Sequence, residues 1–154
     1  MKRNTRQAFH WIINILRKLK IPFQICGGLD ARVFGSKREL ADIDLIIDGR
    51  KLNLLIPEVR NYIKFGPKHY KDKSWDLTLM TLEYQGQDID ISPKRVKIFD
   101  KIKNKWIVDT ENFTNSVKKK IYGLVVPVDN KRNLIAEKKK LMRRVDVVDI
   151  KAIS

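Results

Sequence analysis

Apolar residues recur every three or four positions near the start of the chain, at Phe9, Ile12, Ile13 and Leu16. This spacing places them on one face of a helix, which we predict over residues 5–19. Pro22 marks the end of that helix. The apolar residues 23–26 then predict a short strand that stops at the glycine pair Gly27-Gly28. The chain is therefore expected to open with an amphipathic helix followed by a strand.

Runs of β-branched residues and alternating polar and apolar residues predict the strands that follow. Residues 42–47 form a β-branched run typical of a buried strand. Residues 77–84 and 88–91 predict a hairpin connected at Gln85-Gly86, and residues 96–108 predict another hairpin.

Helical patterns and turn residues occupy most of the remaining chain. We predict short helices at 29–34, around 52–62 and at 112–120, with a turn at Gly66-Pro67. A short apolar run at 124–128 precedes a last helix that Asp129 or Asn130 can N-cap. That helix is expected to run to about Arg144, with a further turn or helix from 145 to 153.

The order of these elements predicts an α+β fold in which helices flank a mixed β-sheet. A length of 154 residues fits one domain, so we expect residues 1–154 to form a single domain with a helical C-terminal segment at about 130–153. No apolar run approaches the roughly 20 residues that cross a bilayer. The N-terminal segment lacks a small-residue cleavage site, so we expect neither a membrane span nor a secretory signal.

Asp42 and Asp44 are the first candidates for chemistry. Side chains two positions apart on a strand share a face, so both carboxylates project together. Such oxygen ligands favour Mg²⁺ or Mn²⁺. Without a cation or a basic neighbour, the two charges would repel each other and raise one pKa. An isolated Asp-x-Asp is more often the solvent face of a strand, so the interpretation depends on what surrounds the pair.

Two surrounding features support a site. Thirteen residues separate Gly28 from Asp42, and a glycine turn that opens a short helix can present backbone N–H groups to phosphate. Asp88 and Asp90 alternate with isoleucines on a later predicted strand. A third carboxylate beside the pair would allow two-metal phosphoryl or nucleotidyl transfer. It would also be a candidate general base toward an acceptor hydroxyl.

A glycine pair, an Asp-x-Asp and one aspartate on a later strand together resemble the nucleotidyltransferase superfamily of the polymerase-β type. Residues 26–31 and 38–45 are most similar to small single-domain members. Those members include aminoglycoside nucleotidyltransferases and the nucleotidyltransferase toxins of abortive-infection systems. The resemblance implies the nucleotidyltransferase fold and an Mg²⁺-dependent (or Mn²⁺-dependent) enzyme. Such an enzyme transfers a nucleoside monophosphate from an NTP to an acceptor.

The resemblance also implies roles for individual residues. The catalytic and metal-binding carboxylates would be Asp42, Asp44 and Asp90, with Asp88 as the alternative to Asp90. The nucleotide-binding residues would be Gly27, Gly28, Arg38 and Lys138. Arg38 occupies a basic position four residues before the first aspartate. Lys138 matches a lysine that reaches the triphosphate from a closing helix, although it equally fits a solvated basic helix face.

The resemblance leaves the acceptor-binding surface unassigned, because residues 52–75 and 94–128 match no pattern of the family. We expect no counterpart of the separate helical domain of larger members within these 154 residues. Completion of the acceptor pocket by a homodimer or by a partner protein is therefore an open expectation. Trp75, which follows Lys71 and Lys73, is the best candidate to stack on a base.

Charge limits the partners. The chain carries 33 lysine and arginine residues against 18 aspartate and glutamate residues, a formal net charge of +15. Such a surface attracts polyanions, so we expect NTP and RNA as partners, with the tRNA acceptor end as one candidate. A polycationic aminoglycoside would prefer an acidic pocket, which disfavours drug modification. A solvated lysine surface without functional meaning is the simpler explanation of the charge.

Two other classes of function stay open at this point. The chain would be a nucleic-acid-binding module if the fold survives without catalysis, or a basic structural protein if the glycine–aspartate spacing is accidental. The position of Asp90 distinguishes an active enzyme from these two alternatives, because metal-dependent transfer needs Asp90 beside Asp42 and Asp44. With Cys26 as the one cysteine and only two histidines, neither a disulfide nor a zinc site is predicted, and a cytoplasmic location is expected.

Overall fold

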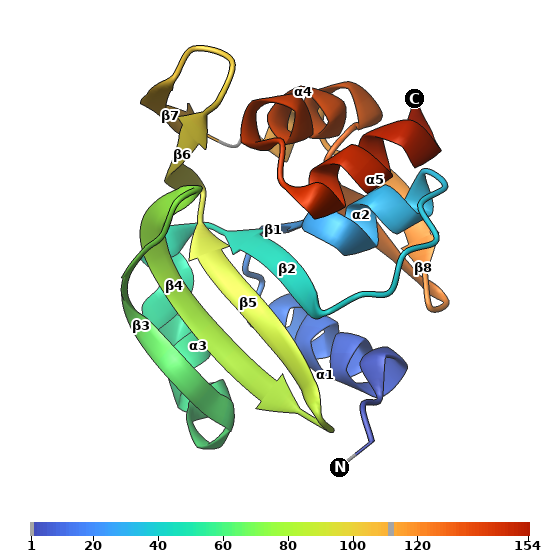
Figure 1. Cartoon of the computed structure of the whole chain (residues 1–154). Helices are drawn as coiled ribbons and strands as arrows, with labels where there is room; N and C mark the ends of the chain where they lie inside the picture. The colour runs from blue at the N-terminus through green and yellow to red at the C-terminus, as the bar shows by residue number, and fades with distance from the viewer. Residues whose placement is uncertain (1, 111–112) are drawn as a thin grey trace.

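A computed structural model describes residues 2–110 and 113–154 of the chain. Its strands join one nine-stranded sheet in the order β7-β6-β4-β5-β2-β1-β9-β8, with β3 paired to β4. Helices pack against this sheet (Figure 1). The expected α+β class, a mixed sheet flanked by helices, is confirmed.

The strands are β1 (Phe23–Cys26), β2 (Asp42–Ile47), β3 (Ile63–Lys71), β4 (Trp75–Tyr84), β5 (Gln87–Pro93), β6 (Arg95–Asp100), β7 (Lys105–Thr110), β8 (Val117–Ile121) and β9 (Leu124–Val128). The helices are α1 (Thr5–Lys18), α2 (Gly27–Val33), α3 (Leu52–Val59), α4 (Lys131–Leu141) and α5 (Arg144–Ile153). No helix in the described ranges is long and apolar enough to cross a membrane.

The middle of the sheet combines parallel and antiparallel pairing. Strand β2 runs antiparallel to β1 and parallel to β5. Its register with β5 places Asp42 opposite Asp88 and Asp44 opposite Asp90. Because opposed residues in such a ladder point to the same side of the sheet, the acidic residues of both strands share one face.

The opposite face of the same strands carries the main core. Ile43 and Leu45, which alternate with the two aspartates on β2, are 0% and 1% exposed. They belong to one cluster with the buried stripe of α1 formed by Phe9, Ile12, Ile13 and Leu16. A slip of one residue in β2 would exchange the isoleucine and leucine with the aspartates. Core burial therefore fixes which way the aspartates face.

Two predicted elements are wrong. The helix expected at 112–120 is replaced by β8, which pairs antiparallel with β9, while Asn112 itself lies outside the described residues. Three consecutive exposed lysines on β8 suit a strand at the edge of a sheet, because they discourage further pairing. The turn expected at Gly66-Pro67 lies inside β3, where the register with β4 shifts. An edge strand tolerates proline, since no partner needs its missing N–H.

Candidate active site

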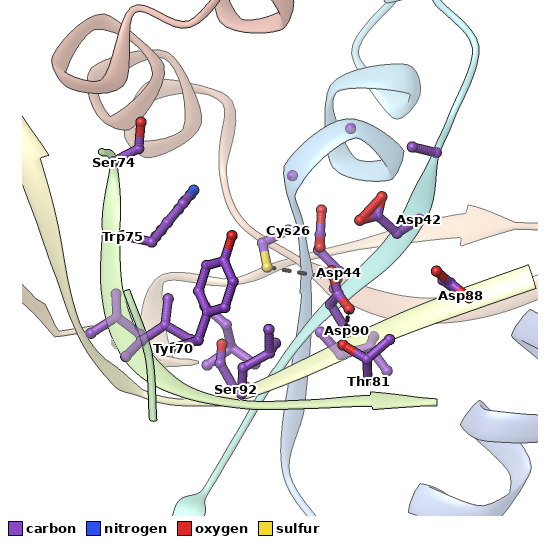
Figure 2. Close-up of a pocket in the computed structure, with 18 of the residues that line it drawn as sticks. Cys26, Asp42, Asp44, Tyr70, Ser74, Trp75, Thr81, Asp88, Asp90 and Ser92 are labelled. Atoms are coloured by element: carbon purple, nitrogen blue, oxygen red, sulfur yellow. Dashed lines mark hydrogen bonds between the residues drawn. The ribbon is translucent and has the colours of Figure 1, made fainter. Parts of the chain in front are cut away.

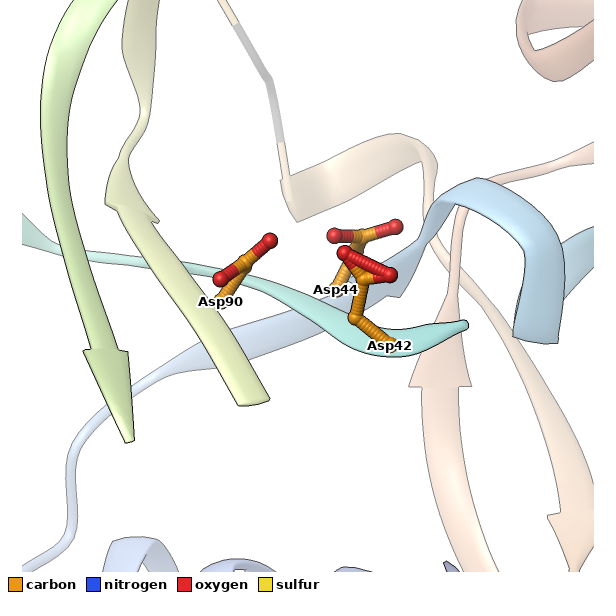
Figure 3. Close-up of side chains that lie close together, drawn as sticks. All are labelled: Asp42, Asp44 and Asp90. Atoms are coloured by element: carbon orange, nitrogen blue, oxygen red, sulfur yellow. The ribbon is translucent and has the colours of Figure 1, made fainter. Parts of the chain in front are cut away.

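Asp42, Asp44 and Asp90 meet on the acidic face of β2 and β5 (Figure 3). One carboxylate oxygen from each lies within 4.8 Å of the others, and all three residues are half-buried. The hydroxyl of Thr81 on β4 donates a hydrogen bond of 2.7 Å to Asp90. We refer to these three aspartates as the carboxylate trio. Their oxygens are the donors that Mg²⁺ and Mn²⁺ prefer, so the chemistry of the donor set fits a divalent cation.

Asp88, the alternative third carboxylate, has a different environment. Its two carboxylate oxygens lie 3.2 and 3.0 Å from Nζ of Lys64. The same ammonium is 3.4 Å from Glu83. Asp88 is thus neutralised by a lysine, while Asp90 lies with the pair on β2. The structure brings Asp90 rather than Asp88 into the carboxylate trio.

The carboxylate trio is electrostatically strained without a cation. Burial, followed by repulsion from Asp42 and Asp90, raises the pKa of Asp44 well above its usual value. Burial is also the main cause that raises the pKa of Asp90 to about 7; the proximity of Asp42 adds to this, and the hydrogen bond from Thr81 opposes it. Shifts of this kind arise where carboxylates share a site, and a bound cation relieves them.

The glycine pair is required by close packing around the carboxylate trio. Gly27 has φ +65°, and a Cβ at this position would overlap the carboxylate of Asp44. A Cβ on Gly28 would lie 2.6 Å from Nη2 of Arg38 and 2.9 Å from Leu40. Helix α2 begins at Gly27, two residues earlier than predicted. The glycines therefore let the first turn of α2 approach Asp44 and Arg38 directly.

A network of buried charges joins α4 and α5 to the segment before β2. Asp149 accepts hydrogen bonds from Nε and Nη2 of Arg38 at 2.8 and 2.9 Å, and from the Ser36 hydroxyl at 2.7 Å. Nζ of Lys138 lies 2.9 Å from Asp149 and 3.4 Å from Asp146. Asp149 and Asp146 are both fully buried. We call Arg38, Lys138, Arg143, Asp146 and Asp149 the charge network.

The charge network changes how two predicted nucleotide-binding residues are understood. Arg38 is held by a bidentate contact to a residue 111 positions away in the sequence. Lys138 is only 2% exposed, so its charge is shared by two buried carboxylates rather than directed into solvent. Both residues nevertheless line the cavity beside the carboxylate trio.

That cavity has a volume of about 650 Å³. Its walls include the carboxylate trio, both glycines of the pair, and Arg38, Lys138 and Arg143 of the charge network. Figure 2 shows the trio on one side of the cavity, with Tyr70 and Trp75 on the other; a dashed line marks the weak hydrogen bond of 3.6 Å from the Cys26 thiol to the Asp44 carbonyl. The cavity thus joins a carboxylate set whose chemistry fits a divalent cation, three cations of the charge network and an aromatic surface.

No protein-family model matches the chain, and no curated protein matches it significantly. Solved structures do. A candidate nucleotidyltransferase from Thermotoga maritima superimposes with a TM-score of 0.69 at 14% identity, over 96% of this chain and 92% of that one. The lincosamide antibiotic adenylyltransferase LnuA, solved with lincomycin bound, gives 0.65 at 15% identity over 99% and 98%. The chain has the nucleotidyltransferase fold. The antibiotic-resistance factor ANT(2'')-Ia gives 0.61 at 17% identity over 96% and 80%.

Arg143 is among the cavity residues of this nucleotidyltransferase fold that the sequence patterns did not single out. Arg143 precedes α5, bonds Asp146 through Nε at 2.8 Å, and lies 5.4 Å from the ring centre of Trp75. Its positive charge also acts on Asp44 and lowers the pKa of that carboxyl, against the larger effect of burial. The sequence gives little indication that Arg143 lines a cavity, because Arg143 and Arg144 are adjacent in a basic segment. Only the fold shows which of the two lines the cavity.

Proposed function

We propose that the protein is a metal-dependent nucleotidyltransferase that transfers a nucleoside monophosphate from an NTP to an acceptor hydroxyl. The observation that carries this proposal is the carboxylate trio, gathered from two strands into a cavity that also holds three cations of the charge network. A site that binds an NTP with its metal ions needs donors for the metal and positive charge for the phosphates. Both are present in one cavity within this fold.

In this proposal Asp42, Asp44 and Asp90 hold Mg²⁺ or Mn²⁺, which would supply charge neutralisation for the triphosphate and activation of the acceptor oxygen. Gly27, Gly28, Arg38 and Lys138 form the nucleotide side of the cavity. Arg38 is fixed in place by Asp149, so its donors are oriented before any ligand arrives. Lys138 contributes its positive charge through space, because both of its short contacts are to buried carboxylates.

The transfer itself is a displacement at phosphorus. The acceptor oxygen forms a bond to the α-phosphorus, and the bond from that phosphorus to the bridging oxygen of the β-phosphate breaks. The leaving pyrophosphate takes the electron pair. The acceptor proton passes to the carboxylate of Asp90, the candidate general base of the carboxylate trio.

The position of Asp90 supports an enzyme over a catalytically inactive binding module. In a module without catalysis, no requirement would keep three carboxylates in contact against their mutual repulsion. LnuA, which shares the fold, is named a lincosamide antibiotic adenylyltransferase. That name supports nucleotidyl transfer as the chemistry, while the acceptor of this chain depends on its own cavity.

The test combines a binding and a transfer measurement. Wild-type protein is incubated with each α-³²P-labelled NTP, Mg²⁺, and either total cell RNA or a small-molecule extract, and the labelled product is separated. Calorimetry measures Mn²⁺–NTP binding with a non-hydrolysable analogue. Asp44→Asn is expected to abolish labelling and weaken Mn²⁺–NTP binding at least tenfold.

Asp88→Asn is the matched control, because it removes the same charge from the same face of the sheet while leaving the carboxylate trio intact. It should retain most of the activity. Equal Mn²⁺–NTP affinity in wild type and Asp44→Asn would exclude the metal assignment, and equal losses in both variants would show that overall cavity charge matters rather than the trio.

A further inference from the structure

One side of the cavity has no role in the proposed transfer. It consists of Phe65 and Tyr70 from β3 and of Trp75, Leu77 and Leu79 from β4. We call these five residues the aromatic wall. The alternate residues of β4, Met80 and Leu82, are 1% and 0% exposed in the main core. On the cavity side, Trp75 and Leu77 pack in part against a small apolar cluster that includes Leu141 of α4. This stretch of β4 therefore carries apolar residues on both faces.

Apolar residues on both faces of one strand are unusual in an antiparallel ladder, where the second face is normally polar. The residues of the aromatic wall are all half-buried, and they lie inside the cavity rather than on an open surface. Ligand cavities are lined in this way, by apolar and aromatic side chains with a few placed polar groups. The aromatic wall is suited to an apolar body of a bound molecule.

The placed polar group here is Asp72, in the turn between β3 and β4. Its Oδ1 accepts hydrogen bonds of 2.8 Å from the backbone N–H groups of Ser74 and Trp75. Its Oδ2 accepts one of 2.7 Å from the hydroxyl of Tyr70. Burial opposes ionisation, but these hydrogen bonds outweigh it and hold the pKa of Asp72 below its usual value. The aromatic wall therefore ends at a fixed, ionised carboxylate.

The charges that line the cavity contrast with the charge of the whole chain. Six carboxylates and four cations line it, although the chain carries a net charge of +15. Each of these four cations already has a carboxylate partner: Arg38 with Asp149, Lys138 with Asp149, Arg143 with Asp146, and Lys64 with Asp88. Lys68 lies over the ring of Phe65 at 4.5 Å but is not part of the lining.

This distribution does not suit a nucleic-acid acceptor. Proteins bind nucleic acid largely through lysine and arginine contacts to phosphates. Two of the described lining cations lie next to the aromatic wall. Arg143 lies over the ring of Trp75 and Lys64 precedes Phe65 on β3, and both are paired with other carboxylates. A carboxylate beside aromatic rings is instead the combination that attracts an ammonium group.

We propose that the acceptor is a small molecule with an apolar ring body and a protonated amine, seated on the aromatic wall with its amine toward Asp72. This rests on the proposed function. The geometry connects the two: Thr81 follows Leu79 on the same face of β4 and bonds Asp90. The end of the wall at Thr81 therefore adjoins the carboxylate trio, and in this proposal the hydroxyl of the seated molecule lies there. A cavity of about 650 Å³ falls within the range of small-molecule sites.

The test measures acceptor binding without metal or NTP, so that it does not depend on transfer. Tyramine and tyrosol share a phenol ring and differ in carrying an amine or an alcohol. Each is titrated into ¹⁵N-labelled protein, and a short single-stranded RNA is titrated separately. Tyramine should bind at least fivefold more tightly than tyrosol and shift the amide signals of Tyr70, Trp75 and Leu77.

Asp72→Asn is expected to reduce tyramine affinity to that of tyrosol, because the amide keeps the turn but lacks the charge. Asp76→Asn is the matched control: it neutralises a neighbouring aspartate that pairs with His69 and does not line the cavity, and it should leave the preference unchanged.

The outcomes separate the two proposals. Equal affinities for tyramine and tyrosol, or a preference that survives Asp72→Asn, would overturn the acceptor assignment even if nucleotidyl transfer is demonstrated. RNA that shifts the same amides and becomes labelled in the transfer assay would overturn it in favour of a nucleic-acid acceptor. Amine binding at the wall together with unchanged Mn²⁺–NTP binding in Asp44→Asn would instead remove the proposed function, and with it the identification of this amine site as an acceptor site.

Discussion

Asp149→Asn is the change that most directly tests the charge network. The carboxylate of Asp149 is fully buried and contacts three side chains: those of Ser36, Arg38 and Lys138. Asparagine keeps the volume and one acceptor oxygen, but it brings an N–H₂ group toward donors. Lys138, which is 2% exposed, would keep Asp146 at 3.4 Å as its remaining ion-pair partner among the described residues. The substitution therefore leaves a buried cation poorly compensated.

The magnitude follows from burial. Removing one partner of a buried ion pair costs about 3–5 kcal/mol, and the low end applies here because Lys138 retains Asp146 and the Arg38 side chain is 20% exposed. We expect the free energy of unfolding to fall by about 3 kcal/mol. In a chain of this size each kcal/mol shifts the melting temperature by roughly 2–4 °C, so Tm should fall by about 6–12 °C.

Urea unfolding at pH 7 and at lower pH measures the effect. Burial opposes ionisation of Asp149, but its contacts with Arg38, Ser36 and Lys138 outweigh this and lower its pKa. A carboxyl whose pKa is lower in the folded state contributes stability above its unfolded pKa, about 3.9, and loses that contribution as the pH falls through the folded value. The gap between wild type and Asp149→Asn should be constant above about pH 5 and narrow below pH 4.

The control is Asp48→Asn, which breaks a pair of the same length, 2.8 Å, with an Arg50 side chain that is 86% exposed. It should change stability much less, because the guanidinium of Arg50 stays solvated when its partner is neutralised, so that no buried cation is left unpaired. An unfolding free energy within about 1 kcal/mol of wild type for Asp149→Asn, or a loss no larger than that of Asp48→Asn, would refute the reasoning from burial.

Three further predictions concern the site and the core. Gly27→Ala should weaken Mn²⁺ binding more than tenfold in calorimetry, because the added methyl overlaps Asp44; unchanged affinity would show that α2 shifts freely. Thr81→Val should raise the pKa of Asp90 in NMR titration of the metal-free protein, since the hydroxyl's hydrogen bond lowers that pKa; a lower value contradicts this. Leu82→Ala should cost about 2–5 kcal/mol in urea unfolding, because Leu82 is 0% exposed in the core; a cost below 1 kcal/mol would mean that the core refills.

The sequence predicted those strands whose own composition is decisive. Predicting β2 from its β-branched run, and the hairpin from Gln85-Gly86, needs little information about tertiary contacts. The structure contains both elements. Strand β8 could not be predicted in this way. Its lysine-rich sequence has no strand pattern, and it is held as a strand by pairing with β9 at the edge of the sheet. Tertiary pairing outweighed local preference there.

The same limit applies to the site. The spacing of Asp42 and Asp44 indicates a shared face, and the alternation in β5 offers Asp88 or Asp90 as a third group. Choosing between them required the register of the sheet and the position of Lys64, which local patterns do not contain. The charge network is even harder to predict from the sequence, because Arg38 and Asp149 are 111 positions apart.

That separation has a consequence for the order in which the protein is made. A ribosome completes β2 and β5, with all three aspartates of the carboxylate trio, long before it reaches Asp149. A nascent chain that stops between α4 and α5 carries Arg38 and Lys138 without the carboxylate that holds them together. In the course of synthesis, the carboxylate trio is therefore complete before the charge network, and the activity proposed here would require α5 to dock first.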